Sequence, residues 1–71
     1  MIRDKIEYII MLVKLFAQHF GLNYLQAFRY ISLHGGIEYV EKHYDILHTL
    51  PFDDQVEGLA AFCRKKGGML V

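Results

Sequence analysis

Apolar side chains recur at helical spacing through most of this chain of 71 residues. In the first twenty positions they stand three and four residues apart, which is the spacing of one face of an α-helix. This row consists of Ile2, Ile6, Ile9, Val13, Phe16 and Phe20. Gly21 follows the row directly, and a glycine at that place is typical of the residue that ends a helix.

The same segment carries a second apolar row on its other side. Its members are Tyr8, Met11, Leu12 and Leu15. A helix that is apolar nearly all round has to be covered nearly all round. We therefore expect the first helix to be central in the domain, or to pair with a second chain. In the second case, the second row is the candidate face of a homodimer.

A second helix is predicted from the polar residues that precede it. Asn23 and Gln26 have the spacing of a capping box, in which each side chain bonds the backbone of the other residue. Gly35 and Gly36 are expected to end this helix. The side chains expected to face the core are Leu25, Phe28, Ile31 and Ser32.

Two more helices follow. A short one is predicted over residues 37–43, with Ile37, Val40 and Tyr44 facing inward. The last begins at about residues 51–53, where proline and aspartate suit a first helical turn, and it ends at Gly67. Its apolar face is formed by Phe52, Val56, Leu59, Ala60 and Cys63.

The sequence Tyr-Asp-Ile-Leu-His-Thr at residues 44–49 separates the last two helices. We expect it to be irregular or a single 3₁₀ turn. No segment shows the period-two alternation of a β-strand. The predicted fold is therefore all-α: one helical domain over residues 1–71, a small bundle of about four helices with this short segment before the last one.

The composition adds an expectation about partners. Hydrophobic residues make up 54% of the chain, and a domain this short has a limited interior. Some apolar surface should therefore lie outside the core and meet a protein partner or a second copy. No apolar run approaches the roughly 20 residues that span a bilayer, and the charged start is a poor signal peptide. We expect a cytoplasmic protein with no membrane partner.

The single cysteine, Cys63, cannot form an intramolecular disulfide, which fits a reducing compartment. On the apolar face of the last helix, it is expected to pack rather than to react.

The charges are unevenly distributed although they cancel overall. Residues 37–57 hold six carboxylates against one lysine, a net charge of −5, whereas residues 64–66 are all basic. An acidic middle is unsuited to a phosphate backbone, which binds clusters of lysine and arginine. The basic triplet fits the end of a helix, where the macrodipole favours cations.

Residue spacing gives no catalytic or metal site. The histidines at positions 19, 34, 43 and 48 match no zinc-binding pattern, and no glycine-rich phosphate loop precedes a helix. Asp45 and His48 have the spacing of an acid–base pair, but no nucleophile or pocket signature accompanies them. We expect neither an enzyme nor a cofactor.

A structural role is the leading interpretation of the segment at 44–49. Asp45 is expected to accept backbone N–H groups in an Asx or N-cap turn. His48 and Thr49 are expected to bond nearby backbone and to hold the entry to the last helix. The residues of this structural motif are Tyr44, Asp45, Leu47, His48 and Thr49. Direct contact of the motif with a partner remains the alternative.

Tyrosines and carboxylates are the candidate partner contacts. Tyr30 and Tyr39 lie off the predicted inner stripes, which favours exposure, and tyrosine suits interfaces. The acidic stretch would steer a basic partner surface. The full candidate set is Tyr30, Tyr39, Glu38, Glu41, Asp53 and Asp54.

A second class of function stays open. The second and third helices with Gly35 and Gly36 between them have the order of a helix-turn-helix, in which residues 37–43 would read DNA. Two glutamates and one lysine make that helix a poor reader of a polyanion. Nucleic-acid contact is therefore disfavoured, and a DNA-binding regulator is the alternative hypothesis.

The chain resembles a family of small, uncharacterised bacterial proteins with a Tyr-Asp-x-Leu-His-Thr core. Gly36, Ile37, Glu41 and residues 44–49 carry the resemblance, which extends over about residues 6–67. These domains of unknown function are common in gut Firmicutes and Bacteroidetes. The resemblance implies no activity and no catalytic residue. The resemblance also implies a gene position next to genes for ADP-ribosyltransferase-like proteins, and hence an antitoxin or immunity-type partner. The leading hypothesis is a protein–protein interaction module.

Overall fold

The computed structural model describes the backbone of residues 2–67 and the side chains of residues 5–67. Within that range it contains helices and turns and no strand. The helices are α1 (Ile2–Phe20), α2 (Tyr24–Leu33), α3 (Gly36–Lys42), α4 (Tyr44–Leu47) and α5 (Phe52–Lys65). The predicted all-α bundle is confirmed. The segment before the last helix contains one short α-helix, α4, instead of the irregular or 3₁₀ segment that was expected.

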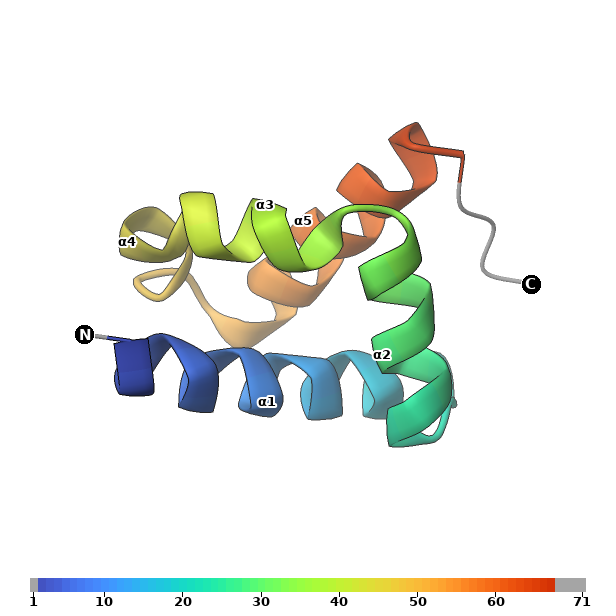
Figure 1. Ribbon diagram of the computed structural model, residues 1–71. Coiled ribbons are helices and arrows are strands. Elements are labelled where there is room, and N and C mark those ends of the chain that lie inside the picture. Colours follow the sequence, from blue (N-terminus) through green and yellow to red (C-terminus); the bar gives the residue numbers. More distant parts are fainter. Residues whose placement is uncertain (1, 68–71) are drawn as a thin grey trace.

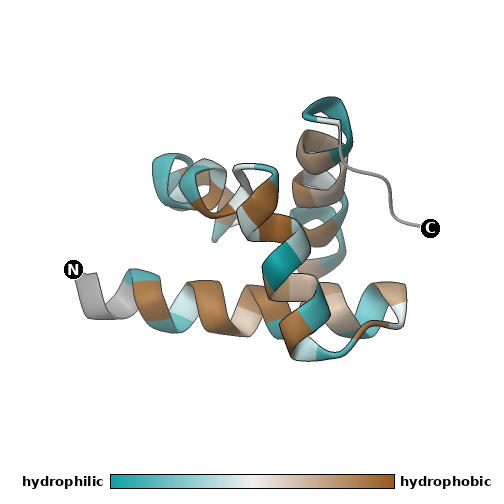
Figure 2. Ribbon diagram, turned by 45° about the vertical axis from the view of Figure 1, so that its right-hand side comes forward, coloured by the Kyte–Doolittle hydropathy of each residue, from teal (hydrophilic) through white to brown (hydrophobic). Residues whose placement is uncertain are grey.

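The longest helix, α1, forms one side of the molecule, and α3 and α4 run back along the opposite side (Figure 1). Helix α2 connects the two sides at one end. Helix α1 packs on α2, α3 and α5, and α5 also packs on α3. The core lies where these four helices meet, and hydrophobic residues recur along α1 (Figure 2). It consists of Leu12, Val13, Phe16, Ala17, Ala27, Ile31, Val40, Leu47, Val56, Leu59, Ala60 and Cys63.

Both apolar rows of α1 contribute to this core, so the second row is not the uncovered surface that was expected of a dimer face. Leu12 from the second row is 1% exposed, and Tyr8 and Leu15 pack against the core. Met11, the fourth member, is half-buried. Helices α2, α3 and α5 all pack on α1, which is why part of its second row is covered within one chain. The part of α1 left outside instead includes Ile6, which the sequence had placed in the buried row.

Helix α2 begins as predicted but turns a different face inward. The capping box is present: the Asn23 side chain accepts from Gln26 N, and the Gln26 side chain accepts from Asn23 N. Ala27 and Ile31 are buried, whereas Leu25 and Phe28 are 55% and 40% exposed. The small side chain of Ala27 allows another helix to approach α2 closely. A prediction that assigns the largest apolar side chains to the core does not identify Ala27 as buried. The predicted stripe of Leu25, Phe28, Ile31 and Ser32 is right only for Ile31.

The two glycines between α2 and α3 have different roles. Gly35 has a φ of 74°, the left-handed conformation that reverses the chain after a helix. Gly36 is already the first residue of α3 and is buried. A Cβ atom at Gly36 would lie 2.5 Å from Ile31 Cγ2 and 3.0 Å from Ile31 O. The absence of a side chain at position 36 therefore lets α3 start directly against α2.

Helix α5 has the predicted buried face with one exception. Val56, Leu59, Ala60 and Cys63 are buried, but Phe52 is 55% exposed. The buried place in the first turn is taken by Gln55, which is 1% exposed. Gly67 follows the helix with a φ of 91°, as expected for a residue that ends it.

Candidate interaction surfaces

The segment at 44–49 forms a hydrogen-bonded corner between α3 and α5. The His48 ring donates from Nδ1 to Tyr44 O at 2.8 Å, and Thr49 Oγ1 donates to Ile46 O at 2.7 Å. Leu47 is buried in the core. These contacts confirm the predicted backbone bonding by His48 and Thr49.

Asp45 does not have the predicted capping role. It lies inside the first turn of α4, and the residue before that helix, His43, makes no side-chain cap. The Asp45 carboxylate is exposed and accepts no hydrogen bond from a described residue. Asp45 lies in the first turn because α4 starts at Tyr44, two residues earlier than a cap at position 45 requires.

Aromatic stacking joins the corner to α1. The Tyr44 ring lies against the His48 ring at 4.9 Å between centroids, and it meets the edge of the Tyr8 ring at 5.1 Å. The ammonium group of Lys5 lies 5.8 Å from the Tyr44 centroid, a distance suited to a cation–π contact. The tyrosine and histidine of the motif therefore serve as packing groups.

A hydrogen-bonded polar pair, Tyr8 and Gln55, connects α1 to α5 next to this corner. The Tyr8 hydroxyl donates to Gln55 Oε1, and Gln55 Nε2 donates to Leu50 O at 2.7 Å. Burial, with neighbouring Tyr44 and Tyr39, raises the pKa of Tyr8 to about 12. Sequence reasoning missed Gln55. The only signal for it is a polar residue beside Val56 on an otherwise apolar face.

The two tyrosines that were expected to be exposed are partly buried. Tyr30 and Tyr39 pack against the core, so that expectation is wrong. The Tyr30 ring lies 5.9 Å from that of Phe16, its hydroxyl has no hydrogen-bond partner among described groups, and burial raises its pKa. The Tyr39 ring stacks on Phe62 at 4.4 Å. Tyrosine has a large apolar body, and here that body closes the core edge.

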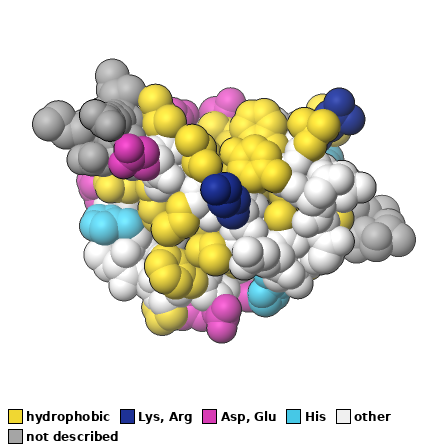
Figure 3. Space-filling view, turned by 90° about the horizontal axis from the view of Figure 1, so that it is seen from below, with side chains coloured by type: hydrophobic (Ala, Val, Ile, Leu, Met, Phe, Trp, Pro, Cys, Tyr) yellow, Lys and Arg dark blue, Asp and Glu magenta, His cyan; other side chains and the backbone are white. Residues whose placement is uncertain are grey.

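Among the described helices, α2 carries the most exposed large apolar side chains. Tyr24 and Phe28 stack with their rings 6.3 Å apart and nearly parallel, and both remain accessible. Leu25 and Leu33 are also exposed, Leu33 at 80%. Figure 3, which views the molecule from the α1 side, shows hydrophobic side chains exposed across that face, with a basic group among them. On α1 the exposed large residues are Ile6 and Ile10.

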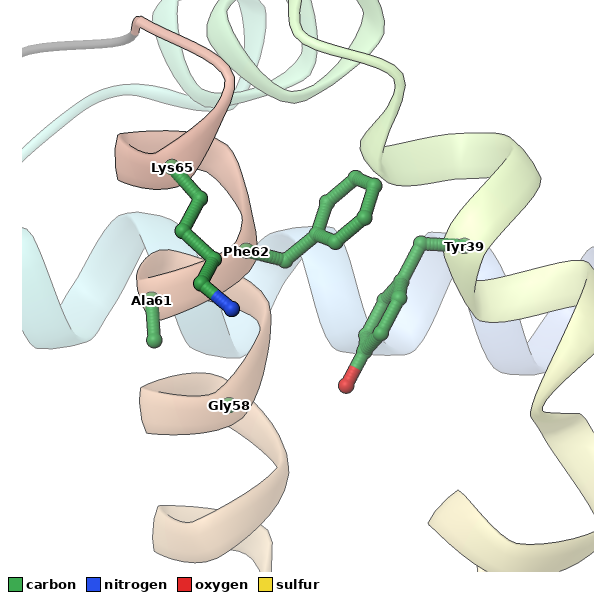
Figure 4. Close-up of a pocket in the computed structure, with 5 residues that line it drawn as sticks. All are labelled: Tyr39, Gly58, Ala61, Phe62 and Lys65. Carbon is green, nitrogen blue, oxygen red and sulfur yellow. The ribbon is translucent and has the colours of Figure 1, made fainter.

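A second surface feature is a hollow between α3 and α5. It has a volume of about 310 Å³ and is lined by Tyr39, Gly58, Ala61, Phe62 and Lys65. Figure 4 shows the Tyr39 ring reaching from α3 toward α5, with its hydroxyl directed toward Gly58. The ammonium group of Lys66 lies 5.6 Å from the Phe62 centroid. The hollow thus has an aromatic wall, a floor of small residues and a basic rim.

The predicted acidic contacts are all on the surface. Glu38, Glu41, Asp53 and Asp54 are exposed, but they come from two different helices. Glu38 and Glu41 lie on α3, the helix that a helix-turn-helix interpretation would place against DNA. Their exposure supplies negative charge where a phosphate backbone would have to approach.

The remaining titratable groups form no reactive cluster in the described part of the chain. No three His, Cys, Asp or Glu side chains between residues 5 and 67 lie where they could hold one metal ion. His19 Nε2 lies 2.7 Å from Glu57 Oε2, which links α1 to α5. Cys63 is fully buried, and burial raises the pKa of its thiol to about 11. The thiol is therefore a packing group, as its position on α5 indicated.

Comparison with protein families gives a match over residues 7–66 to the family described as "Protein of unknown function (DUF3791)". The chain belongs to this family. The match confirms the resemblance to a domain of unknown function and covers the corner, the hollow and the exposed face of α2. Comparisons with curated proteins and with solved structures gave no match. In the described part of the chain, no helix has the length and hydropathy to cross a membrane.

Proposed function

We propose that this domain is a non-catalytic module that binds another protein through the outer face of α2. The observation that carries the proposal is the exposure of four large apolar side chains on a ten-residue helix. These side chains are Tyr24, Leu25, Phe28 and Leu33. They spread over about half of the helix circumference, from Tyr24 beside the buried Ile31 round to Leu33 on the far side.

The face has the features of a helix that lies in a groove of its partner. Amphipathic helices of this kind insert apolar anchors at helical spacing. Tyr24 and Phe28 are four residues apart and stack on each other, so their rings lose little freedom on binding. The only charged residue of α2 is Arg29, which is exposed. The chemistry that fits is an apolar groove with a carboxylate at its edge.

The product of a neighbouring gene is the first partner to test. The family resemblance links such domains to genes beside ADP-ribosyltransferase-like proteins, so the specific form of the proposal is an antitoxin or immunity-type protein. Such a protein would act by occupying a surface of its partner. This role needs no catalytic residue in the domain.

Co-expression tests the proposal directly. The domain and the neighbouring product should co-purify and bind in titration calorimetry. Changing Phe28→Ser should weaken binding about tenfold or more, as for an aromatic anchor at the centre of an interface. The control is Ile46→Ser, which alters an apolar residue on α4 that is more exposed than Phe28. Duplex DNA titrated at two salt concentrations tests the alternative. Salt-sensitive DNA binding without a protein partner would overturn the proposal.

A further inference from the structure

We propose that the outer face of α5 binds the same face of a second copy of this chain, in an antiparallel pair related by a two-fold axis. This surface differs from the α2 face, so the pair and the partner complex can coexist. The proposal rests on the hollow, on unpaired charges at both ends of α5 and on their order along the helix.

Four residues define the outer face of α5. Asp54, Gly58, Ala61 and Lys65 are spaced by four, three and four, which places them on one side of a helix. Asp54, Ala61 and Lys65 are exposed, and Gly58 is half-exposed. Three of the four line the hollow. The side of α5 that carries them is therefore separate from its buried face.

The charges on α5 are self-complementary when two copies run antiparallel. The helix has Asp53 and Asp54 in its first turn and Arg64 and Lys65 in its last. Neither Asp54 nor Lys65 forms an ion pair with a described residue. A two-fold axis at the level of residues 59–60 places Asp54 opposite the partner's Lys65, and Lys65 opposite the partner's Asp54. The antiparallel macrodipoles also attract each other.

The same register places the small residues at the crossing point. Gly58 then lies opposite the partner's Ala61, so two helix backbones can approach closely. Glycine is among the least favourable residues inside a helix. A Cβ atom at Gly58 would meet only the Tyr39 hydroxyl, at 3.7 Å, an ordinary contact. The packing within one chain therefore does not require glycine at position 58, whereas a close helix pair uses it.

A two-fold arrangement is favoured over an unrelated partner because each half of the face supplies what the other half lacks. In an isologous interface, a contact between two positions occurs twice. One acidic and one basic position therefore give two ion pairs around the central contact. The aromatic wall formed by Tyr39 and Phe62 borders this contact on the α3 side.

Charge reversal tests the register. The mass of the intact chain in solution is measured from low micromolar to millimolar concentration by sedimentation or light scattering. Wild type should dimerise, and each single variant, Asp54→Lys or Lys65→Asp, should weaken the dimer about tenfold or more through two like-charge pairs. An equimolar mixture of the two variants should form a heterodimer, because opposite charges then face each other at both positions.

Two controls make the result decisive. Glu41→Lys changes an exposed carboxylate on α3 and should leave the dimer unchanged. Gly58→Leu should abolish it while the helical circular dichroism signal persists. A strictly monomeric wild type would overturn the proposal. So would a dimer that both single variants retain, or a mixture that does not restore association.

Discussion

Tyr8 and Gln55 are 47 positions apart, and the hydroxyl of Tyr8 donates a hydrogen bond to the side-chain oxygen of Gln55. The side-chain nitrogen of Gln55, Nε2, in turn donates a hydrogen bond to Leu50 O at 2.7 Å. This chain of bonds ties α1, the corner before α5 and α5 itself together. The contacts of residues 44–49 explain this segment as a packed connection between α3 and α5.

Removing the Tyr8 hydroxyl should destabilise the fold. Tyr8→Phe keeps the ring but leaves Gln55 Oε1 buried without its partner, which costs about 1–3 kcal/mol. Urea unfolding followed by circular dichroism measures the change. The control is Tyr24→Phe, on an exposed ring without a hydrogen-bonded hydroxyl, which should have almost no effect. Equal stability of Tyr8→Phe and wild type would show that this hydrogen bond contributes nothing.

Two glycines provide a matched pair. Gly36→Ala should cost about 1–3 kcal/mol, because its Cβ would overlap Ile31. Gly58→Ala should stabilise the monomer by about 0.5–1 kcal/mol, since it removes a glycine from a helix interior without a clash. Both are measured at low protein concentration, so that self-association does not add to stability. The opposite order of the two variants would contradict the described packing of α3 on α2.

Two candidate caps should differ in their effect. Asn23→Ala removes a capping box and should cost about 1 kcal/mol. Asp45→Ala removes a carboxylate that accepts no backbone hydrogen bond, so its cost should stay within about 0.5 kcal/mol. The sequence alone had predicted a capping cost for Asp45 as well. Thermal or urea unfolding of the two variants decides between these expectations. A larger loss for Asp45→Ala than for Asn23→Ala would restore the capping interpretation.

Alkaline pH should weaken the fold through Cys63. Burial raises the thiol pKa from 9.0 to about 11, so the folded chain holds this proton more tightly than the unfolded chain does. The resulting stability is fully present below pH 9 and is lost as pH rises toward 11. Unfolding midpoints between pH 8 and 11 should therefore fall, and less steeply in Cys63→Ala.

The same burial predicts that the thiol is unreactive in the folded chain. A disulfide reagent at pH 8 should modify Cys63 only after unfolding. Rapid modification of the native protein would contradict the burial of this side chain.

The sequence predicted those features that depend on local chemistry or on clear periodicity. The Asn23 and Gln26 capping box, the end of α1 at Gly21 and the buried face of α5 from Val56 to Cys63 were all predicted. These depend on neighbours one or two turns away. These features can therefore be predicted without knowing how the helices are arranged.

The missed features depend on which helix lies beside which. Ala27 is buried instead of Phe28, and Leu12 belongs to the core instead of a dimer face. Gln55 is buried because Tyr8, far away in the sequence, supplies its partner. Tyr30 and Tyr39 pack at the edge of the core because Phe16 and Phe62, on other helices, lie beside their rings. Periodicity finds the apolar residues of a helix, but it does not say which of them the neighbouring helices cover.

The most direct test of the account compares Phe28→Ser with His48→Ala in titration calorimetry against the neighbouring gene product. The account predicts that Phe28→Ser loses about tenfold or more in affinity, whereas His48→Ala, provided it stays folded, binds like wild type. This outcome would assign binding to α2 and a structural role to the corner. Full binding by Phe28→Ser together with loss of binding by a folded His48→Ala would contradict it, and would make the motif the contact surface.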